Sequence, residues 1–231
     1  MPLRRLVLVT AATLLVLDAG LAAAVPGPRT AARPPMLAST GFSLGSNGGL
    51  GGEAHLSFDR FAGGLPIAAR FELAYRQTDA GDPILARRVF VNQATDGTPA
   101  SSANRWDFRL DAVHTFRAIP NLSVYGGPRF SMYAAHFDYI GGNEVFDVDS
   151  RQFGLGMGLE SRYPMTPRSD LIVGAGVDRY LDAAISGHDS TYNPDGTTVN
   201  AKENFTYAIA NRAIHQPEWA PRLTLGVGYK L

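Results

Sequence analysis

Acidic and basic residues alternate with apolar ones in two stretches of the chain, at positions 70, 72 and 76 and at positions 105, 107, 109 and 111. A period of two places such residues on one face of a β-strand, and apolar residues occupy the other face. Side chains of opposite charge on one face could either form a network of ion pairs or line a path for ions or solutes.

Seven acids and six bases fall on this charged face when the alternation is followed along the whole chain. Nearly balanced charges at short spacing neutralise one another, so we favour an interlocked network that fills a narrow lumen. Ten residues are predicted to form the lumen charge network: Arg70, Glu72, Arg76, Arg105, Asp107, Arg109, Asp111, Arg129, Glu160 and Asp178. Glu53, Asp59 and Lys230 share the same face.

Evidence for catalysis is weak. His188, Asp189 and Ser190 are adjacent in a polar loop, and His136 lies in another loop. His114 belongs to the apolar face and is expected to point toward lipid. Ordinary loop polarity accounts for these residues, so we predict no catalytic residue. No metal-ligand spacing, phosphate loop or nucleotide fingerprint is present, and no cofactor is predicted.

Eight alternating segments position the charged side chains, and the most regular of them is 65–77. The others are 37–45, 53–59, 104–117, 122–134, 150–163, 170–181 and 223–231. Gly126, Gly127 and Pro128 interrupt the fifth segment, where we expect a bulge or kink because proline cannot donate to a sheet ladder. Inward-facing glycines gather in the last three segments, which predicts a lopsided lumen with long side chains reaching toward a glycine-lined wall.

The third and fourth segments should pair in one particular register. Placing Arg70 opposite Asp111 sets Glu72 opposite Arg109, whereas the next register would oppose Glu72 and Asp111. Opposed like charges destabilise a strand pair and opposite charges stabilise it by roughly 0.2–1 kcal/mol. The predicted register leaves Arg76 opposite Arg105 near the open mouth.

The ends of the chain indicate export. Residues 1–24 combine Arg4 and Arg5, a short apolar run and a small-residue cleavage site, and are predicted to be a signal peptide. Residues 25–36 are rich in proline and are interpreted as a flexible periplasmic tail, and residues 37–231 as the barrel domain. The chain has no cysteine and a formal net charge of zero, so neither disulfides nor a nucleic-acid partner is indicated.

Short and long connections alternate along the chain, and the long ones (78–103, 135–149 and 182–220) fall on one side of a barrel. A soluble lipocalin-like barrel is the main alternative, but it would bury charges in a small core. A membrane barrel places the apolar face against lipid. Apolar residues within the long loops suggest strands that extend above the membrane or a short capping helix; a ninth and tenth barrel strand is a less favoured alternative.

The final strand alternates strictly, with Leu225, Val227, Tyr229 and Leu231 on its apolar face. This pattern resembles the closing strand of bacterial outer-membrane barrels, and the whole chain is similar to the small barrels of the OmpA, OmpX and OmpW kind. The resemblance implies an all-β, eight-stranded antiparallel up-and-down transmembrane β-barrel in the outer membrane. It also implies contact with outer-membrane lipid, and with the insertion machinery through these four residues.

Three functions remain open from the sequence: a structural or surface-interaction barrel acting through its long loops, an OmpW-like channel for small solutes, and a lipid-modifying enzyme. The first is favoured, with an unidentified surface ligand. Aromatic girdles are expected at both rims of the lipid-facing wall. Tyr75 and Trp106 are assigned to the outer rim, and Phe61, Phe116, Tyr163 and Tyr229 to the inner rim.

Overall fold

The structure is a computed structural model that describes residues 38–59, 66–92, 96–119, 121–142, 144–200, 202 and 204–231. Phe61 and the segments interpreted as signal peptide and tail lie outside the described residues. Eight long strands form the barrel within the described part: β1 (Ala38–Asn47), β2 (Leu50–Phe58), β3 (Ala68–Thr78), β4 (Thr98–Thr115), β5 (Leu122–Ile140), β6 (Val145–Pro164), β7 (Ser169–Tyr180) and β11 (Trp219–Lys230).

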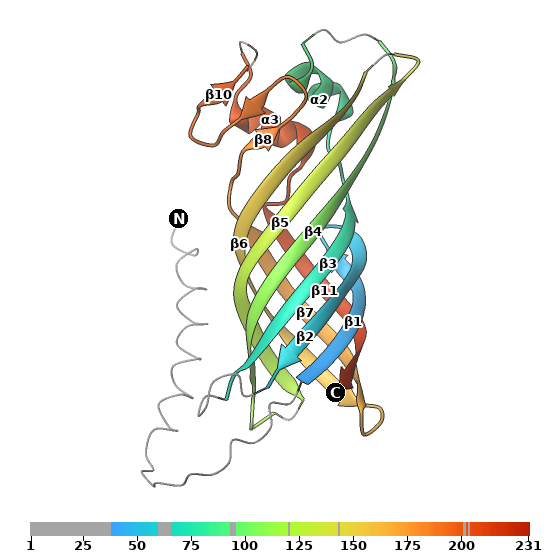
Figure 1. The fold of residues 1–231 in the computed structure, drawn as a ribbon, viewed down its shortest axis with the longest axis vertical. Helices are drawn as coiled ribbons and strands as arrows, with labels where there is room; N and C mark the ends of the chain where they lie inside the picture. The colour runs from blue at the N-terminus through green and yellow to red at the C-terminus, as the bar shows by residue number, and fades with distance from the viewer. Residues whose placement is uncertain are drawn as a thin grey trace.

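These strands pair antiparallel in chain order from β1 to β7, and β11 pairs with both β7 and β1 (Figure 1). Pairing on both sides of β11 closes the sheet, which removes the exposed edges of an open sheet. The predicted eight-stranded antiparallel barrel is therefore confirmed. Helices α2 and α3 lie at one end of the barrel, here called the cap end, and the C-terminus lies at the opposite, short-turn end.

The predicted register between the third and fourth segments is confirmed. Arg70 pairs with Asp111, Glu72 with Arg109, and Arg76 with Arg105. The predicted bulge at Pro128 is wrong: β4 and β5 keep one register from Ala112 with Gly126 to Arg109 with Arg129. The ladder simply skips the positions between those pairs, so the missing N–H of proline is accommodated without a shift.

Several connections are shorter than the sequence predicts. Residues 46–52 are expected to form a turn, but the strands continue and only Gly48 and Gly49 connect them. Gly48 has φ +67°, a conformation that glycine adopts without steric cost. The structure also extends β4 through 98–103, β5 through 135–140 and β6 through 145–149, where the sequence predicts mostly loop.

The polarity of the two faces inverts along the extended strands. In the barrel, β5 points Arg129 inward and Phe130 outward, whereas nearer the cap it points Phe137 inward and leaves His136 exposed. The strands keep the same two-residue period throughout. Apolar side chains therefore face outward in the barrel and inward in the section nearer the cap. The row containing Tyr75, Trp106 and Met132 lies at this boundary.

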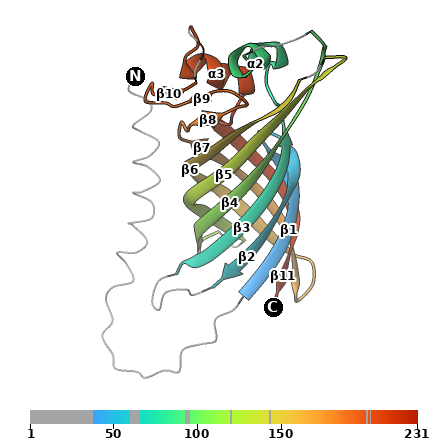
Figure 2. The ribbon, with the colours of Figure 1, turned by 45° about the horizontal axis from the view of Figure 1, so that its top comes forward.

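The cap closes over the inverted section of the sheet (Figures 1 and 2). It contains α2 (Pro83–Phe90), α3 (Tyr207–Ile214) and three two-residue strands, β8 (Ile185–Ser186), β9 (Thr191–Tyr192) and β10 (Thr198–Val199). The small strands extend the sheet from the cap end of β6 and are not barrel strands. Among the described residues, neither helix has the length and apolar content needed to cross a membrane.

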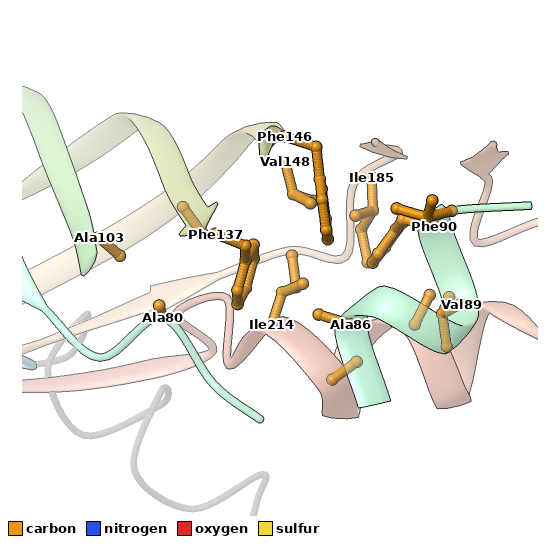
Figure 3. Close-up of a cluster of buried hydrophobic side chains, with 14 of the residues drawn as sticks. Ala80, Ala86, Val89, Phe90, Ala103, Phe137, Phe146, Val148, Ile185 and Ile214 are labelled. Atoms are coloured by element: carbon orange, nitrogen blue, oxygen red, sulfur yellow. The ribbon is translucent and has the colours of Figure 1, made fainter. Parts of the chain in front are cut away.

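The cap has a hydrophobic core of its own (Figure 3). Phe90 of α2 and Ile214 of α3 are fully buried there against Phe137 and Phe146 from the ends of β5 and β6. Asp82 accepts hydrogen bonds from the backbone N–H groups of Ile84 (2.9 Å) and Leu85 (3.1 Å), which caps α2.

Candidate functional site

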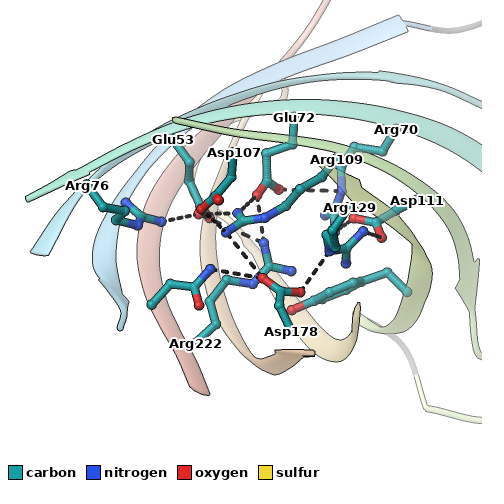
Figure 4. A network of polar contacts seen from close by, with 12 residues as sticks. Glu53, Arg70, Glu72, Arg76, Asp107, Arg109, Asp111, Arg129, Asp178 and Arg222 are labelled. Atoms are coloured by element: carbon teal, nitrogen blue, oxygen red, sulfur yellow. Dashed lines mark hydrogen bonds and ion pairs between the residues drawn. The ribbon is translucent and has the colours of Figure 1, made fainter. Parts of the chain in front are cut away.

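Seven strands aim charged side chains into the barrel, where they form one connected network (Figure 4). The constant register between neighbouring strands keeps every second residue on the inner face. Charged side chains from different strands therefore lie at similar depths within the barrel. All ten predicted network residues are buried inside the barrel and take part in ion pairs or charged hydrogen bonds with other lumen residues.

Arg109 of β4 lies at the centre of this network. Its guanidinium forms an ion pair with Glu72 and also contacts Glu53 at 3.1 Å, Asp107 at 3.3 Å and Asp178 at 3.3 Å. Four carboxylates drawn from β2, β3, β4 and β7 therefore converge on one cation. A charge-assisted hydrogen bond is stronger than a neutral one, so these contacts connect opposite walls of the barrel.

The part of the network toward the short-turn end is organised around Arg70. Its guanidinium contacts Glu160 at 2.6 Å and Asp111 at 3.3 Å, and lies 4.5 Å above the ring of Tyr125. The guanidinium of Arg222 lies 4.7 Å from the same ring. Tyr125 thus packs with two cations, each of which is neutralised by a carboxylate.

The part toward the cap end contains the remaining cations. Arg76 contacts Glu53 at 2.5 Å, and Arg105 contacts Asp107 at 3.0 Å. The Tyr180 hydroxyl donates a hydrogen bond to Asp107 at 3.1 Å. The opposed cations Arg76 and Arg105 are both fully buried, so the predicted place near an open mouth is wrong; each contacts a carboxylate that it shares with Arg109.

Arg129 bridges Asp111 at 2.8 Å and Asp178 at 2.7 Å, and the glycine-lined wall makes room for it. A Cβ at Gly156 would lie 1.9 Å from Asp178 Oδ1 and 2.5 Å from Arg129 Nε. Likewise, a Cβ at Gly158 would lie 2.1 Å from the Tyr125 hydroxyl. The glycines of β6 therefore accommodate long side chains of the adjacent strand β5, not side chains that reach across the lumen from the third and fourth segments.

The remaining charged positions behave differently. Asp59 is exposed at the short-turn end, and Lys230 there contacts Asp170 at 3.1 Å. Sequence reasoning missed Arg222, which is buried and contacts Glu72 at 2.6 Å. Its even number places it on the same face of β11 as Thr224, so extending the alternation by one residue before Leu223 would have found it.

Hydrogen bonds join the two segments that form the cap. The backbone N–H of Asp82 donates to the Ala213 carbonyl at 2.8 Å. Lys202 donates to the carbonyls of Arg88, at 2.9 Å, and Val91, beside the end of α2. The residues that follow β3 and those that follow β7 consequently form one folded unit.

Asp189 adds a second connection between these segments. The backbone N–H of Asn92 donates to its carboxylate at 2.8 Å and lowers the pKa of that group below its usual value. Its own N–H donates to the Phe90 carbonyl at 3.0 Å. Asp189 thus contacts the end of α2 through both its side chain and its backbone.

No catalytic arrangement is formed by the histidines considered from the sequence. His188 Nδ1 lies 2.8 Å from Asp189, but the Ser190 hydroxyl donates to the Asn200 carbonyl instead. The alternation predicts that His114 faces lipid, yet it is only 8 % exposed, and its Nδ1 lies 3.0 Å from the Pro66 carbonyl. Among the described residues, no three His, Asp or Glu side chains cluster in a way that could hold a metal ion.

The outer wall exposes apolar side chains along the barrel. Tyr75 and Trp106 pack with their ring centroids 4.9 Å apart at the cap-end boundary, while Phe116, Tyr163 and Tyr229 lie at the short-turn end. On β11, Leu225, Val227 and Tyr229 are exposed on this wall, and Leu231 follows the strand. The Leu231 N–H donates to the Ala38 carbonyl at 3.0 Å.

Comparison with solved structures finds bacterial outer-membrane proteins that are similar to this chain. A major outer membrane protein from Thermus thermophilus matches with a TM-score of 0.65 and 21% identity, covering 86% of this chain and 100% of that chain. Ail, the attachment invasion locus protein of Yersinia pestis, matches with a TM-score of 0.45 and 12% identity, covering 85% of this chain and 97% of its own. Neisserial surface protein A gives 0.41 and 14%, with the same coverage.

No family model and no curated protein matches the sequence. The likeness to the Thermus protein shows the fold, which is that of a small eight-stranded outer-membrane β-barrel. The apolar outer wall and the closed sheet agree with that architecture, because every backbone polar group within a bilayer must find a partner inside the protein.

Proposed function

We propose that this outer-membrane barrel is a sealed anchor that presents its cap at the cell surface for contact with a ligand. The cap end faces outward in this arrangement, and the short turns face the periplasm. Leu225, Val227, Tyr229 and Leu231 serve as the signal that the insertion machinery reads. Their placement on the lipid-facing side of the closing strand supports that role.

The observation that supports a sealed lumen best is the position of Arg109. Its guanidinium contacts four carboxylates near the middle of the barrel, and Glu72 among them also contacts Arg222 at 2.6 Å. An ion that crossed the lumen would have to separate these pairs, and separating buried charges costs several kcal/mol. The interior of an eight-stranded barrel is also just wide enough for its own side chains.

The cap supports the presentation role. It is a folded unit with its own core, and hydrogen bonds hold it across both contributing segments. A surface that is ordered before binding loses less conformational entropy when a ligand binds. Its geometry favours binding over catalysis, since Ser190 is not aligned with His188.

Conductance in planar lipid bilayers tests the proposal. The full chain, purified and shown to be folded by its heat-dependent gel mobility, should give no ion-conductance steps. A porin inserted in the same bilayers supplies the positive control. Discrete conductance steps from this protein would contradict the sealed lumen and establish the OmpW-like channel instead.

A further inference from the structure

The lipid-facing wall contains a groove near the cap end, between β1, β2 and β3. Its volume is about 480 Å³. The side chains of Phe42, Leu44, Leu50, Tyr75 and Gln77 line it, together with Gly45, Gly51 and Gly52. All of these residues are uncharged, and most of the lining is apolar.

Glycine at position 52 produces the hollow. In the paired strands, Gly52 lies between Leu44 of β1 and Tyr75 of β3, and its position belongs to the outward-facing set of β2. A Cβ at Gly52 would lie 3.1 Å from Cζ of Phe42 and 3.5 Å from Cδ2 of Leu44. A larger side chain at this position would therefore occupy the groove or push the Phe42 ring.

The groove is continuous with the surface that meets lipid. Tyr75 on its margin packs against Trp106 at the boundary where the outer face changes from apolar to polar. Gln77 lies at its cap-side end, while Phe42 extends toward the apolar middle of the wall. The groove thus runs from the boundary into the hydrocarbon region.

We propose that this groove binds one acyl chain of a membrane lipid. An apolar hollow that is open to the bilayer can be filled by a flexible hydrocarbon chain, whereas the flat wall of a second barrel would leave the hollow unfilled and forgo dispersion contacts. Because no charged side chain lines the groove, recognition falls on the chain itself and not on an anionic headgroup.

Photocrosslinking tests this site. The full chain is reconstituted in phosphatidylethanolamine–phosphatidylglycerol nanodiscs that contain a phosphatidylethanolamine with a diazirine in its acyl chain. After irradiation, adducts are located by mass spectrometry. Adducts on Phe42, Leu44 and Tyr75 should exceed those on the comparison wall residues Val173 and Leu225 several-fold.

Gly52→Leu should lower the groove adducts to the level of the comparison wall. Ala112→Leu, which places the same leucine side chain at an exposed outward position of β4, should leave them unchanged. Gly52→Ala replaces the leucine variant if that variant fails to insert, and it should give a smaller loss in the same direction.

Three outcomes overturn the proposal. Adducts spread evenly over the wild-type wall would show only general lipid contact. Groove labelling that is unaffected by filling position 52 would place the chain elsewhere. Groove adducts that form in nanodiscs holding one copy of the chain but disappear in nanodiscs holding two copies would identify a second copy as the occupant. None of these outcomes depends on conductance, so the test is independent of the sealed lumen.

Discussion

Glu72 contacts three arginines, and its negative charge is the reason they can be buried together. Arg222 lies 2.6 Å away, Arg109 is in direct contact, and Arg70 is at 4.0 Å. Glu72→Gln removes the charge and leaves Arg222 without its nearest carboxylate, and the resulting excess of buried positive charge should lower the free energy of unfolding by about 3–5 kcal/mol. Urea unfolding in lipid vesicles measures the loss.

The matched control is Glu218→Gln. Glu218 contacts Arg179 at 2.8 Å, but its side chain is 57% exposed, so the change should cost no more than about 1 kcal/mol. Equal losses of unfolding free energy from the two substitutions would contradict the view that buried ion pairs of the lumen stabilise the protein more than exposed ones.

Gly156 of β6 has a steric role that Gly126 of the adjacent strand β5 does not share. Gly156→Ala would place a methyl group against the Asp178–Arg129 pair and should destabilise the barrel by about 1–3 kcal/mol. Gly126→Ala, whose nearest contact would be the Gly156 carbonyl at 3.2 Å, should cost less in the same vesicle assay. A larger loss of stability from Gly126→Ala than from Gly156→Ala would contradict the view that the Asp178–Arg129 pair needs a residue without a side chain at position 156.

At the scale of the strand, exposure to lipid determines which substitutions the outward-facing positions of β3 tolerate. Leu73 is 42% exposed on the outer wall, opposite Phe108. If it lies near the bilayer midplane, Leu73→Arg should cost about 2–4 kcal/mol in vesicle refolding. Ser102→Arg, on the outer face beyond the polarity boundary, should change stability by less than about 0.5 kcal/mol.

The cap should loosen in acid while the barrel stays folded. The folded pKa of Asp189 is lowered, so its contribution to stability is present above the unfolded value of about 3.9 and is lost as pH falls through the folded pKa. The pKa of Asp79 shifts in the same direction through the N–H of Gly81. Hydrogen exchange in 181–200 should therefore speed up at low pH relative to the barrel strands.

Asp189→Asn is the control for this acid response. It removes the titrating group, so part of the pH dependence in the cap should disappear and leave faster exchange at neutral pH. An unchanged acid response in this variant would assign the effect to other groups.

The barrel was predictable because its period is uniform, whereas the cap was not. Arg70 and Asp111 could be paired from the sequence alone because charge complementarity selects one register. The polar residues His136 and Asp147 favour a loop over 135–149, although the apolar set has moved to the inner face there. Asp82 followed by Pro83 was an available signal for the start of α2.

The absence of a register shift at Pro128 could not be foreseen either. It depends on the neighbouring strand: the β4–β5 ladder skips this position, and a Cβ at Gly127 would lie 1.9 Å from the Leu110 carbonyl. Such close approach of two backbones is a tertiary property that a single sequence does not display.

For the whole molecule, the alternation of short turns and long connections predicts how it lies in the membrane. Protease added to intact cells should cut within 78–103 or 182–220 and spare the turns 118–121 and 164–169. Within those ranges, the compact cap should restrict cutting to its exposed surface. Cleavage confined to the two short turns would invert the proposed orientation.

The position of Arg222 late in the chain has a consequence for assembly. β11 is synthesised after the other seven barrel strands, and it supplies the cation that contacts Glu72, 150 residues earlier. Before β11 pairs with β1 and β7, Glu72 therefore lacks its contact with Arg222. Closure of the barrel both pairs the remaining strand edges and brings the Arg222 guanidinium to Glu72. Closure should accordingly be all-or-none and slow, since it joins residues far apart in the chain.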